Sequence, residues 1–270
     1  MNLREHIKEL YIGVIICWIV LAIIFGLTDL EISIALVNRA SIWANIGKYY
    51  GEGPGYGIIA IAIAIFIGSY NKDIKKQKIP GYVIMLIGVF FFILGLIIVD
   101  LWYVVFGGSI MFSLLVFIIL TLNRDWTEFK TISMVIILLA IINPLLVVQT
   151  TKILSGRVRF NNLASDYSNY TPWFLPPGPL SGIKGNASFP SGHTAIGWMF
   201  LPLLIQVRER KWSDPIRILI TLFVIGFGLF LGISRIVTGD HFASDILFST
   251  GVAIIATIWL YKRYYIDKNN

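Results

Sequence analysis

Long apolar stretches, each followed by a short polar or basic segment, repeat along the 270-residue chain. A helix of about twenty apolar residues matches the thickness of a bilayer. The roughly forty-residue apolar run at 81–122 is too long for one helix, so it is split by a tight turn at 100–103. The pattern predicts about eight membrane-spanning helices, at 11–27, 58–70, 81–99, 104–122, 131–151, 193–207, 216–233 and 246–261.

The segment 31–50 has a mixed character, with apolar residues at helical spacing interrupted by Asn38, Arg39 and Asn45. Such a pattern is typical of a helix that lies in the membrane interface rather than crossing the bilayer. A glycine-rich turn at 51–57 would then lead into the second span. The first span, 11–27, lacks a small-residue cleavage site, so we expect it to be retained.

Composition supports a polytopic membrane protein, because 57% of the residues are hydrophobic. A soluble domain of this length could not bury so much apolar sequence. We therefore expect an all-α, polytopic membrane helix bundle in a single membrane domain, 1–270. Cys17 is the one cysteine, which excludes a disulfide framework and a thiolate metal cluster.

The net charge of +7 could suggest nucleic acid as a partner. The lysines and arginines are instead concentrated in short segments between spans, above all at 71–80, which is the positive-inside pattern. Eight spans with the N-terminus inside place both termini in the cytoplasm, and they place 152–192 and 234–245 outside. The expected partner is thus the lipid bilayer of the cell membrane, and no nucleic acid.

The predicted outer ends of the later spans carry cations that break the positive-inside rule, and two of the three histidines accompany them. Singly, such residues are headgroup anchors or helix caps. Gathered on one face, they indicate a site for an anion. The gathered residues are Lys152, Arg159, Ser191, His193, Arg235, His241 and Asp245.

The chemistry of these residue types fits phosphoryl transfer. His241 and Asp245 are four apart and share a helix face, so the carboxylate can fix the tautomer and leave the other nitrogen free as a nucleophile or base. Three cations match the charged oxygens of a phosphoryl group in its transition state. Gly192 precedes His193 at an expected helix start, and His193 could protonate the departing oxygen. The neighbouring cations would repel zinc.

Three motifs in this order resemble the signature of the type 2 phosphatidic acid phosphatase (PAP2) superfamily. They are Lys152-x6-Arg159, Pro190-Ser191-Gly192-His193 and Ser234-Arg235-x5-His241-x3-Asp245, over about 131–263. The resemblance implies an integral membrane enzyme with a six-helix core that hydrolyses lipid phosphates or diphosphates without metal or other cofactor. It implies His241 as nucleophile, Asp245 as its orienting partner and His193 as general acid, and it assigns phosphate binding to Lys152, Arg159, Ser191, Gly192 and Arg235.

The chain departs from the family pattern in two ways. Phe160 stands where the first motif has proline, which leaves the cation of Arg159 in place but changes the local backbone. Eight spans also exceed six, and we interpret the hairpin 81–122 as the additional pair, with the first two spans as the alternative.

The resemblance leaves several functions open. We favour a polyprenyl diphosphate such as undecaprenyl diphosphate, hydrolysed at the extracytoplasmic face through a phosphohistidine. Phosphatidic acid, phosphatidylglycerol phosphate or a lipid phosphotransferase reaction are alternatives on the same motifs. A non-enzymatic phospholipid-binding scaffold or transporter would explain the cations, but it would not explain the pairing of His241 with Asp245.

Overall fold

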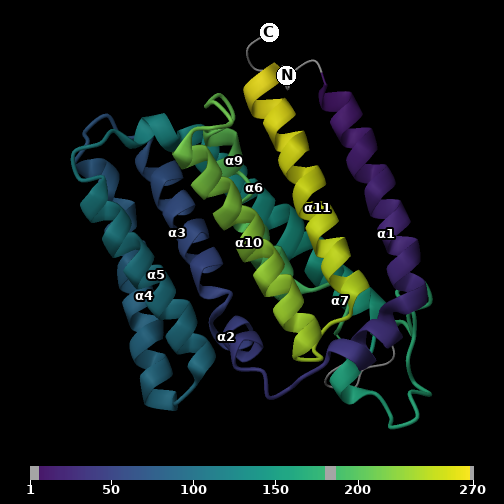
Figure 1. Ribbon diagram of the computed structural model, residues 1–270. Helices are drawn as coiled ribbons and strands as arrows, with labels where there is room; N and C mark the ends of the chain where they lie inside the picture. Colours follow the sequence, from purple (N-terminus) through teal and green to yellow (C-terminus); the bar gives the residue numbers. More distant parts are fainter. Residues whose placement is uncertain (1–5, 180–186, 268–270) are drawn as a thin grey trace.

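The computed structural model describes residues 6–179 and 187–267, and within these ranges it contains helices and no β-strand (Figure 1). The all-α membrane bundle is confirmed, since seven helical segments of the described chain are long and apolar enough to span a membrane. The helices are α1 Ile7–Leu36, α2 Ile42–Tyr50, α3 Gly53–Gly68, α4 Ile79–Ile98, α5 Leu101–Leu120, α6 Lys130–Ala140, α7 Gln149–Ser155, α8 Gly192–Gly197, α9 Leu203–Gln206, α10 Pro215–Val237 and α11 Ala243–Tyr261.

The predicted span 193–207 is not a continuous helix, because it is broken into α8, a 3-10 turn at Trp198–Phe200, and α9. Pro202 has no backbone N–H to continue the helix. The broken span still crosses the bundle. Ser191 N donates to Asp245 O at one end of α11, and Gln206 Nε2 contacts Tyr265 OH near the other. Residues 194–201 are buried, and irregular backbone at membrane depth is tolerated inside protein.

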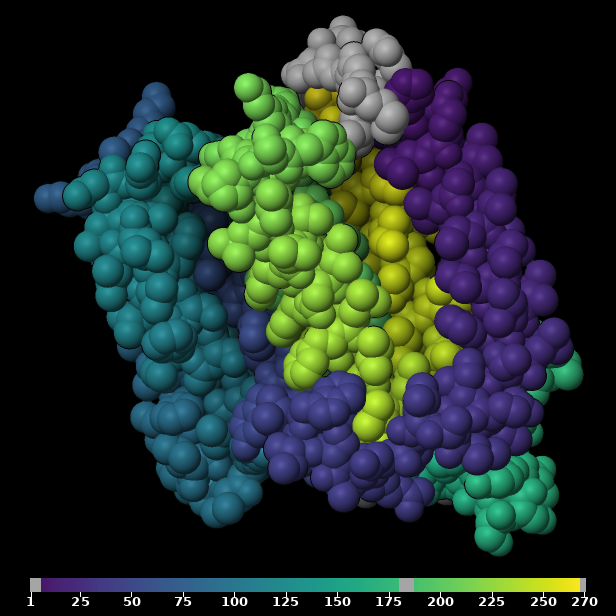
Figure 2. Space-filling model, viewed as in Figure 1, coloured from purple at the N-terminus to yellow at the C-terminus, as the bar shows by residue number. Residues whose placement is uncertain are grey.

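The predicted boundary after the first span was wrong. The helix α1 continues to Leu36, and only α2 remains as a short helix at the end of the bundle, below the long helices (Figure 1). Asp29 and Ser33, which follow the predicted end of the span, are fully buried against the protein, so the helix continues past them. The space-filling view shows α2 and the adjoining chain covering one end of the bundle (Figure 2).

The predicted span 131–151 is longer than expected and contains an irregular centre. The helix α6 passes into a π-helix at Ile141–Val148 and then into α7, which ends at Ser155. Pro144 lies inside the π-helix, and a proline in a helix interior removes one backbone hydrogen bond. This segment therefore carries Lys152 to the end of the bundle where α2 lies.

The predicted turn of the 81–122 hairpin is confirmed. Val99 has a φ of 56°, and the Asp100 side chain accepts a hydrogen bond from Trp102 N at 2.8 Å, which starts α5. The α4–α5 pair packs at the edge of the bundle beside α3 (Figure 1). A Cβ added at Gly57 would lie 2.2 Å from Ser113 Oγ, so glycine permits this close approach.

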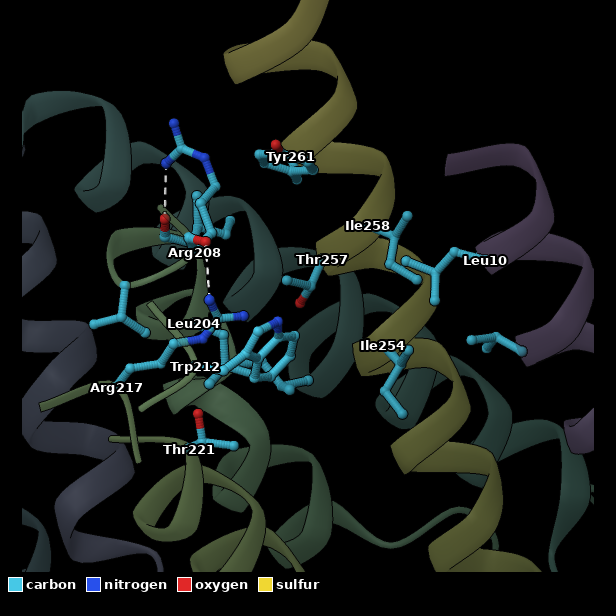
Figure 3. A pocket seen from close by; sticks show the side chains of 14 residues that line it. Leu10, Leu204, Arg208, Trp212, Arg217, Thr221, Ile254, Thr257, Ile258 and Tyr261 are labelled. Atoms are coloured by element: carbon cyan, nitrogen blue, oxygen red, sulfur yellow. Dashed lines mark hydrogen bonds between the residues drawn. The ribbon is translucent and has the colours of Figure 1, made fainter. Parts of the chain in front are cut away.

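The two ends of the bundle differ in chemistry. The start of α1 and the end of α11 lie together at one end, and α2 and α7 lie at the other (Figure 1). Near the first end is a cavity of about 320 Å³, whose walls are mostly apolar, with Arg208 and Arg217 among the lining residues (Figure 3). Its described lining contains no imidazole or carboxylate. A second cavity, of about 410 Å³, contains both kinds of group at the end near α2 and α7.

Candidate active site

The turn between α10 and α11 sets the position of His241. Gly239 adopts a φ of 72°, and its carbonyl accepts a hydrogen bond from Asn161 N at 3.0 Å. A Cβ at Gly239 would lie 2.4 Å from Asn161 Oδ1, so both conformation and space require glycine here. The backbone N–H groups of Asp240 and His241 both donate to Arg235 O at 3.1 Å. The end of α10 thus fixes the backbone of the predicted nucleophile.

His241 and Asp245 lie side by side, as their spacing predicts. The distance from His241 Nδ1 to Asp245 Oδ2 is 3.4 Å, which is longer than an ordinary hydrogen bond. Asp245 Oδ2 already accepts from Phe242 N at 2.9 Å and from Ser188 Oγ. Burial lowers the pKa of His241 well below its usual range, and the Asp245 carboxylate does not offset this effect. The neutral imidazole is the favoured form, and it keeps the lone pair that a nucleophile needs.

Lys152, Arg159 and Arg235 all line the 410 Å³ cavity together with His241. Arg235 Nη2 pairs with Asp240 Oδ2 at 2.9 Å, whereas its Nε and Nη1, and Nε of Arg159, are buried without a partner among the described residues. Burial would raise the pKa of Asp240, but Arg235 and Lys48 outweigh it and hold that pKa at about 2. Buried cationic donors without partners are costly, so this arrangement favours a bound anion.

In the second motif, Gly192 and Ser191 lie differently relative to the cavity. Gly192 lines the cavity, and a Cβ there would lie 3.3 Å from Lys152 Nζ, so glycine leaves room beside the ammonium group. Ser191 lies next to the site but does not line this cavity. Its fully buried hydroxyl accepts from Thr194 N at 3.3 Å and from Thr194 Oγ1 at 2.9 Å, capping α8.

His193 also lines the cavity, and its partners come from a part of the chain that the motifs do not include. His193 Nδ1 lies 2.9 Å from Glu52 Oε1, and Nε2 lies 3.0 Å from Lys48 O. Both partners belong to the junction of α2 and α3. Sequence reasoning missed them because nothing in their spacing links them to residue 193. A lone glutamate in a glycine-rich apolar segment was the available signal.

The departure at Phe160 is explained by aromatic packing. The Phe160 ring stacks on Tyr167 with centroids 6.0 Å apart and meets Phe242 edge-on at 6.3 Å. Phe160 begins a 3-10 turn that ends at Asn162, directly after Arg159. Arg159 thus reaches the cavity without the proline that usually follows it, and the aromatic ring packs against protein.

A buried ion network, also missed from the sequence, lies behind Asp245. Arg157 Nη1 contacts Asp245 Oδ1 at 2.7 Å, and its Nη2 contacts Asp29 Oδ2 at 3.0 Å. The side chains of all three residues are fully buried. Ser244 N donates to Asp29 Oδ1 at 2.9 Å. An aspartate in an apolar span was the sequence signal for this network.

Comparison with known proteins identifies the family. Residues 133–268 match the model of the PAP2 superfamily, close to the predicted 131–263. The chain belongs to the PAP2 superfamily. It is 41% identical over 70 residues to the undecaprenyl-diphosphatase BcrC of Bacillus subtilis (strain 168), covering 26% of this chain and 32% of that protein.

Mammalian PAP2 relatives are also similar. Phospholipid phosphatase 2 of Rattus norvegicus is 32% identical over 73 residues, which cover 26% of each chain. The Bos taurus protein of the same name is 31% identical over 109 residues, 36% of this chain and 38% of that protein. The chain therefore spans less than two fifths of the length of these relatives. No solved structure matches. Asp29, Lys48 and Glu52 lie outside the PAP2 match.

The buried network predicts a large cost for removing its cation. Arg157→Met would leave Asp29 and Asp245 buried without a counter-charge, and we expect a loss of about 3–5 kcal/mol in unfolding free energy. Thermal unfolding of the purified protein in detergent measures this loss of stability. Adding Asp29→Asn should recover part of the loss, and exposed Lys72→Met is the control. Equal melting temperatures for Arg157→Met and Lys72→Met would contradict the role of the network.

Proposed function

We propose that this PAP2 protein hydrolyses a membrane lipid phosphate or diphosphate through a phosphohistidine on His241, without a metal ion. The unpartnered N–H groups of Arg159 and Arg235, which face a cavity shared with His241 and His193, carry the proposal. Three cations supply the positive charge that a metal would otherwise provide. Among the described residues, no group of three or more His, Cys, Asp or Glu side chains is placed to hold a metal.

The proposed reaction has two steps. His241 Nε2 attacks phosphorus in line as the bond from phosphorus to the leaving oxygen breaks, and His193 gives that oxygen a proton. In the second step, water attacks phosphorus and passes a proton to His193. The bond from phosphorus to His241 breaks at the same time. The Asp245 carboxylate stabilises the positive charge on His241 between the two steps. The cations and Gly192 hold the non-bridging oxygens, and the hydroxyl of Ser191 supports them through α8.

For the substrate, we favour a polyprenyl diphosphate such as undecaprenyl diphosphate. The bacterial relative with 41% identity is named an undecaprenyl-diphosphatase, which supports this choice. Apolar side chains of the cavity, including Ile59 and Leu145, would accept the lipid chain, and Leu145 is 59% exposed on the bundle surface. A phospholipid monophosphate is the second candidate, supported by the phospholipid phosphatase relatives. Transfer to an acceptor other than water would use the same first step.

The proposal is tested by phosphate release from a panel of polyprenyl diphosphates and glycerolipid phosphates in the presence of EDTA. We expect turnover in chelator and inhibition by orthovanadate, which mimics the trigonal-bipyramidal transition state. His241→Ala should abolish turnover, and His6→Ala, at the opposite end of α11, should not change it. Activity that is lost in EDTA and restored by magnesium would contradict the mechanism, as would full activity of His241→Ala.

The role of His193 has its own test. His193→Ala should lower turnover of lipid phosphates by about 10²–10⁴-fold, the usual contribution of a general acid. Aryl phosphates with good leaving groups need no proton, so their turnover should fall much less. Steady-state kinetics on both substrate classes measure the difference. Equal losses on the two classes would show that His193 does not act as the acid.

We further propose that the whole chain forms one membrane domain, with this site on the extracytoplasmic side and both termini in the cytoplasm. The basic segment 71–78, at the opposite end from the site, supports this orientation through the positive-inside rule. In a Cys17→Ser background, Ser168→Cys should react with an impermeant thiol reagent applied to whole cells, and Lys72→Cys should not. Both positions are exposed. The opposite labelling pattern would reverse the orientation.

A further inference from the structure

His193 is held by two oxygen acceptors. Its Nδ1 lies 2.9 Å from Glu52 Oε1 and its Nε2 lies 3.0 Å from the Lys48 carbonyl oxygen. Neither a carboxylate nor a carbonyl oxygen can donate a hydrogen bond, and a neutral imidazole has one N–H group. Both contacts are satisfied together only when both ring nitrogens carry protons. The geometry therefore matches the imidazolium form of His193.

Glu52 is itself fixed by its surroundings. Its side chain is 16% exposed, and its second oxygen, Oε2, accepts a hydrogen bond from Tyr56 OH at 2.6 Å. Glu52 lies at the junction of α2 and α3, one turn of helix before Tyr56. The carboxylate is thus restrained from two sides, with one oxygen directed at His193.

The other charged groups around His193 oppose its protonation. Lys152, Arg159 and Arg235 line the same cavity, and their positive charges disfavour an imidazolium. His241, across the cavity, is favoured in its neutral form. Glu52 is the one carboxylate among the described residues that line this cavity. Lys48, which lines an adjoining cavity with His193 and Glu52, is a further cation, and it is paired with Asp240. Glu52 is thus the carboxylate in direct contact with His193.

We propose that Glu52 is a positioning residue for the reaction, which holds His193 in the protonated form through Nδ1 and so keeps a proton on Nε2 for the leaving oxygen. This inference rests on the proposed phosphatase function. Each histidine of the site has a carboxylate partner. Asp245 orients the nucleophile His241, whereas Glu52 stabilises the proton donor His193. It comes from the α2–α3 junction, outside the residues matched by the PAP2 model.

The proton transfers follow from the two contacts of His193. The Nδ1 proton stays with the Glu52 carboxylate, which is the stronger acceptor. The hydrogen bond from Nε2 to the Lys48 carbonyl breaks when the leaving oxygen takes its place. The Nε2 proton then passes to that oxygen as its bond to phosphorus breaks and the bond from His241 to phosphorus forms. In the second step the attacking water returns a proton to Nε2, as phosphorus separates from His241. His193 ends the cycle as it began.

The test compares Glu52→Gln with Glu52→Asp on two substrate classes over a range of pH. For lipid phosphates, Glu52→Gln should lower kcat by about 10–100-fold, within the range of general acid catalysis. The basic limb of its kcat/KM profile should move to lower pH, because His193 loses its proton more easily without the carboxylate. An aryl phosphate with a good leaving group should be affected much less. Glu52→Asp should restore part of the activity.

A double variant separates this role from a structural one. In a His193→Ala background, Glu52→Gln should cause little further loss, because both residues act in one step. Exposed Glu31→Gln is the matched control and should behave as wild type. Orthovanadate inhibition and thermal unfolding of each variant verify that the site is folded.

Two results would overturn the inference. One is a folded Glu52→Gln variant with the wild-type pH profile on lipid phosphates. The other is an equal loss from Glu52→Gln with and without His193. If wild type releases no phosphate from any lipid on the panel, the proposed function itself fails. If the wild type turns over lipid phosphates and Glu52→Gln is equally active, the proposed role of Glu52 fails and the proposed function stands.

Discussion

A charge removed from water must have a partner, and this constraint organises the end of the bundle that carries the site. Arg157 lies between Asp29 and Asp245, Glu52 faces His193, and Asp240 faces Lys48 and Arg235. These pairs join α1, the α2–α3 junction and the α10–α11 turn. The guanidinium N–H groups of the described residues that are buried without a partner, on Arg159 and Arg235, belong to side chains that line the cavity. The buried carboxylates are thus paired, and cationic donors without partners remain at the cavity.

The two histidines of the cavity have different surroundings. His241 is almost fully buried, and Arg157 shares the carboxylate of Asp245, so the neutral form of the imidazole is favoured. His193 is more exposed and receives a carboxylate on one nitrogen and a carbonyl on the other. In the proposed reaction, the His241 ring offers a lone pair and the His193 ring offers a proton, so the two environments match the two roles.

The sequence predicted the residues that short-range spacing brings together, and it missed those that the fold brings together. His241 and Asp245 share one helix start, and the motif cations follow from order and spacing. Glu52 and Asp29 are 141 and 216 positions from the residues they serve, His193 and Asp245, so no local pattern links them. The boundary of α1 was misjudged for the same reason, because the buried Asp29 is paired with Arg157 and Ser244, which lie far along the chain. The π-helix at Pro144 and the break at Pro202 depend on packing that the hydrophobic pattern does not record.

The position of Asp240 has a consequence for the end of the catalytic cycle. Its carboxylate lies 3.0 Å from Lys48 Nζ, 2.9 Å from Arg235 Nη2 and 3.9 Å from Arg159 Nη1. A cluster of bare cations in a buried cavity would retain inorganic phosphate and become blocked by its own product. A resident carboxylate, held ionised by Arg235 and Lys48, neutralises part of the positive charge beside the cavity without occupying the unpaired N–H groups. In the proposed reaction, Asp240 would thus act as a built-in counter-ion that eases release of the phosphate product, at a distance from the bonds that break and form.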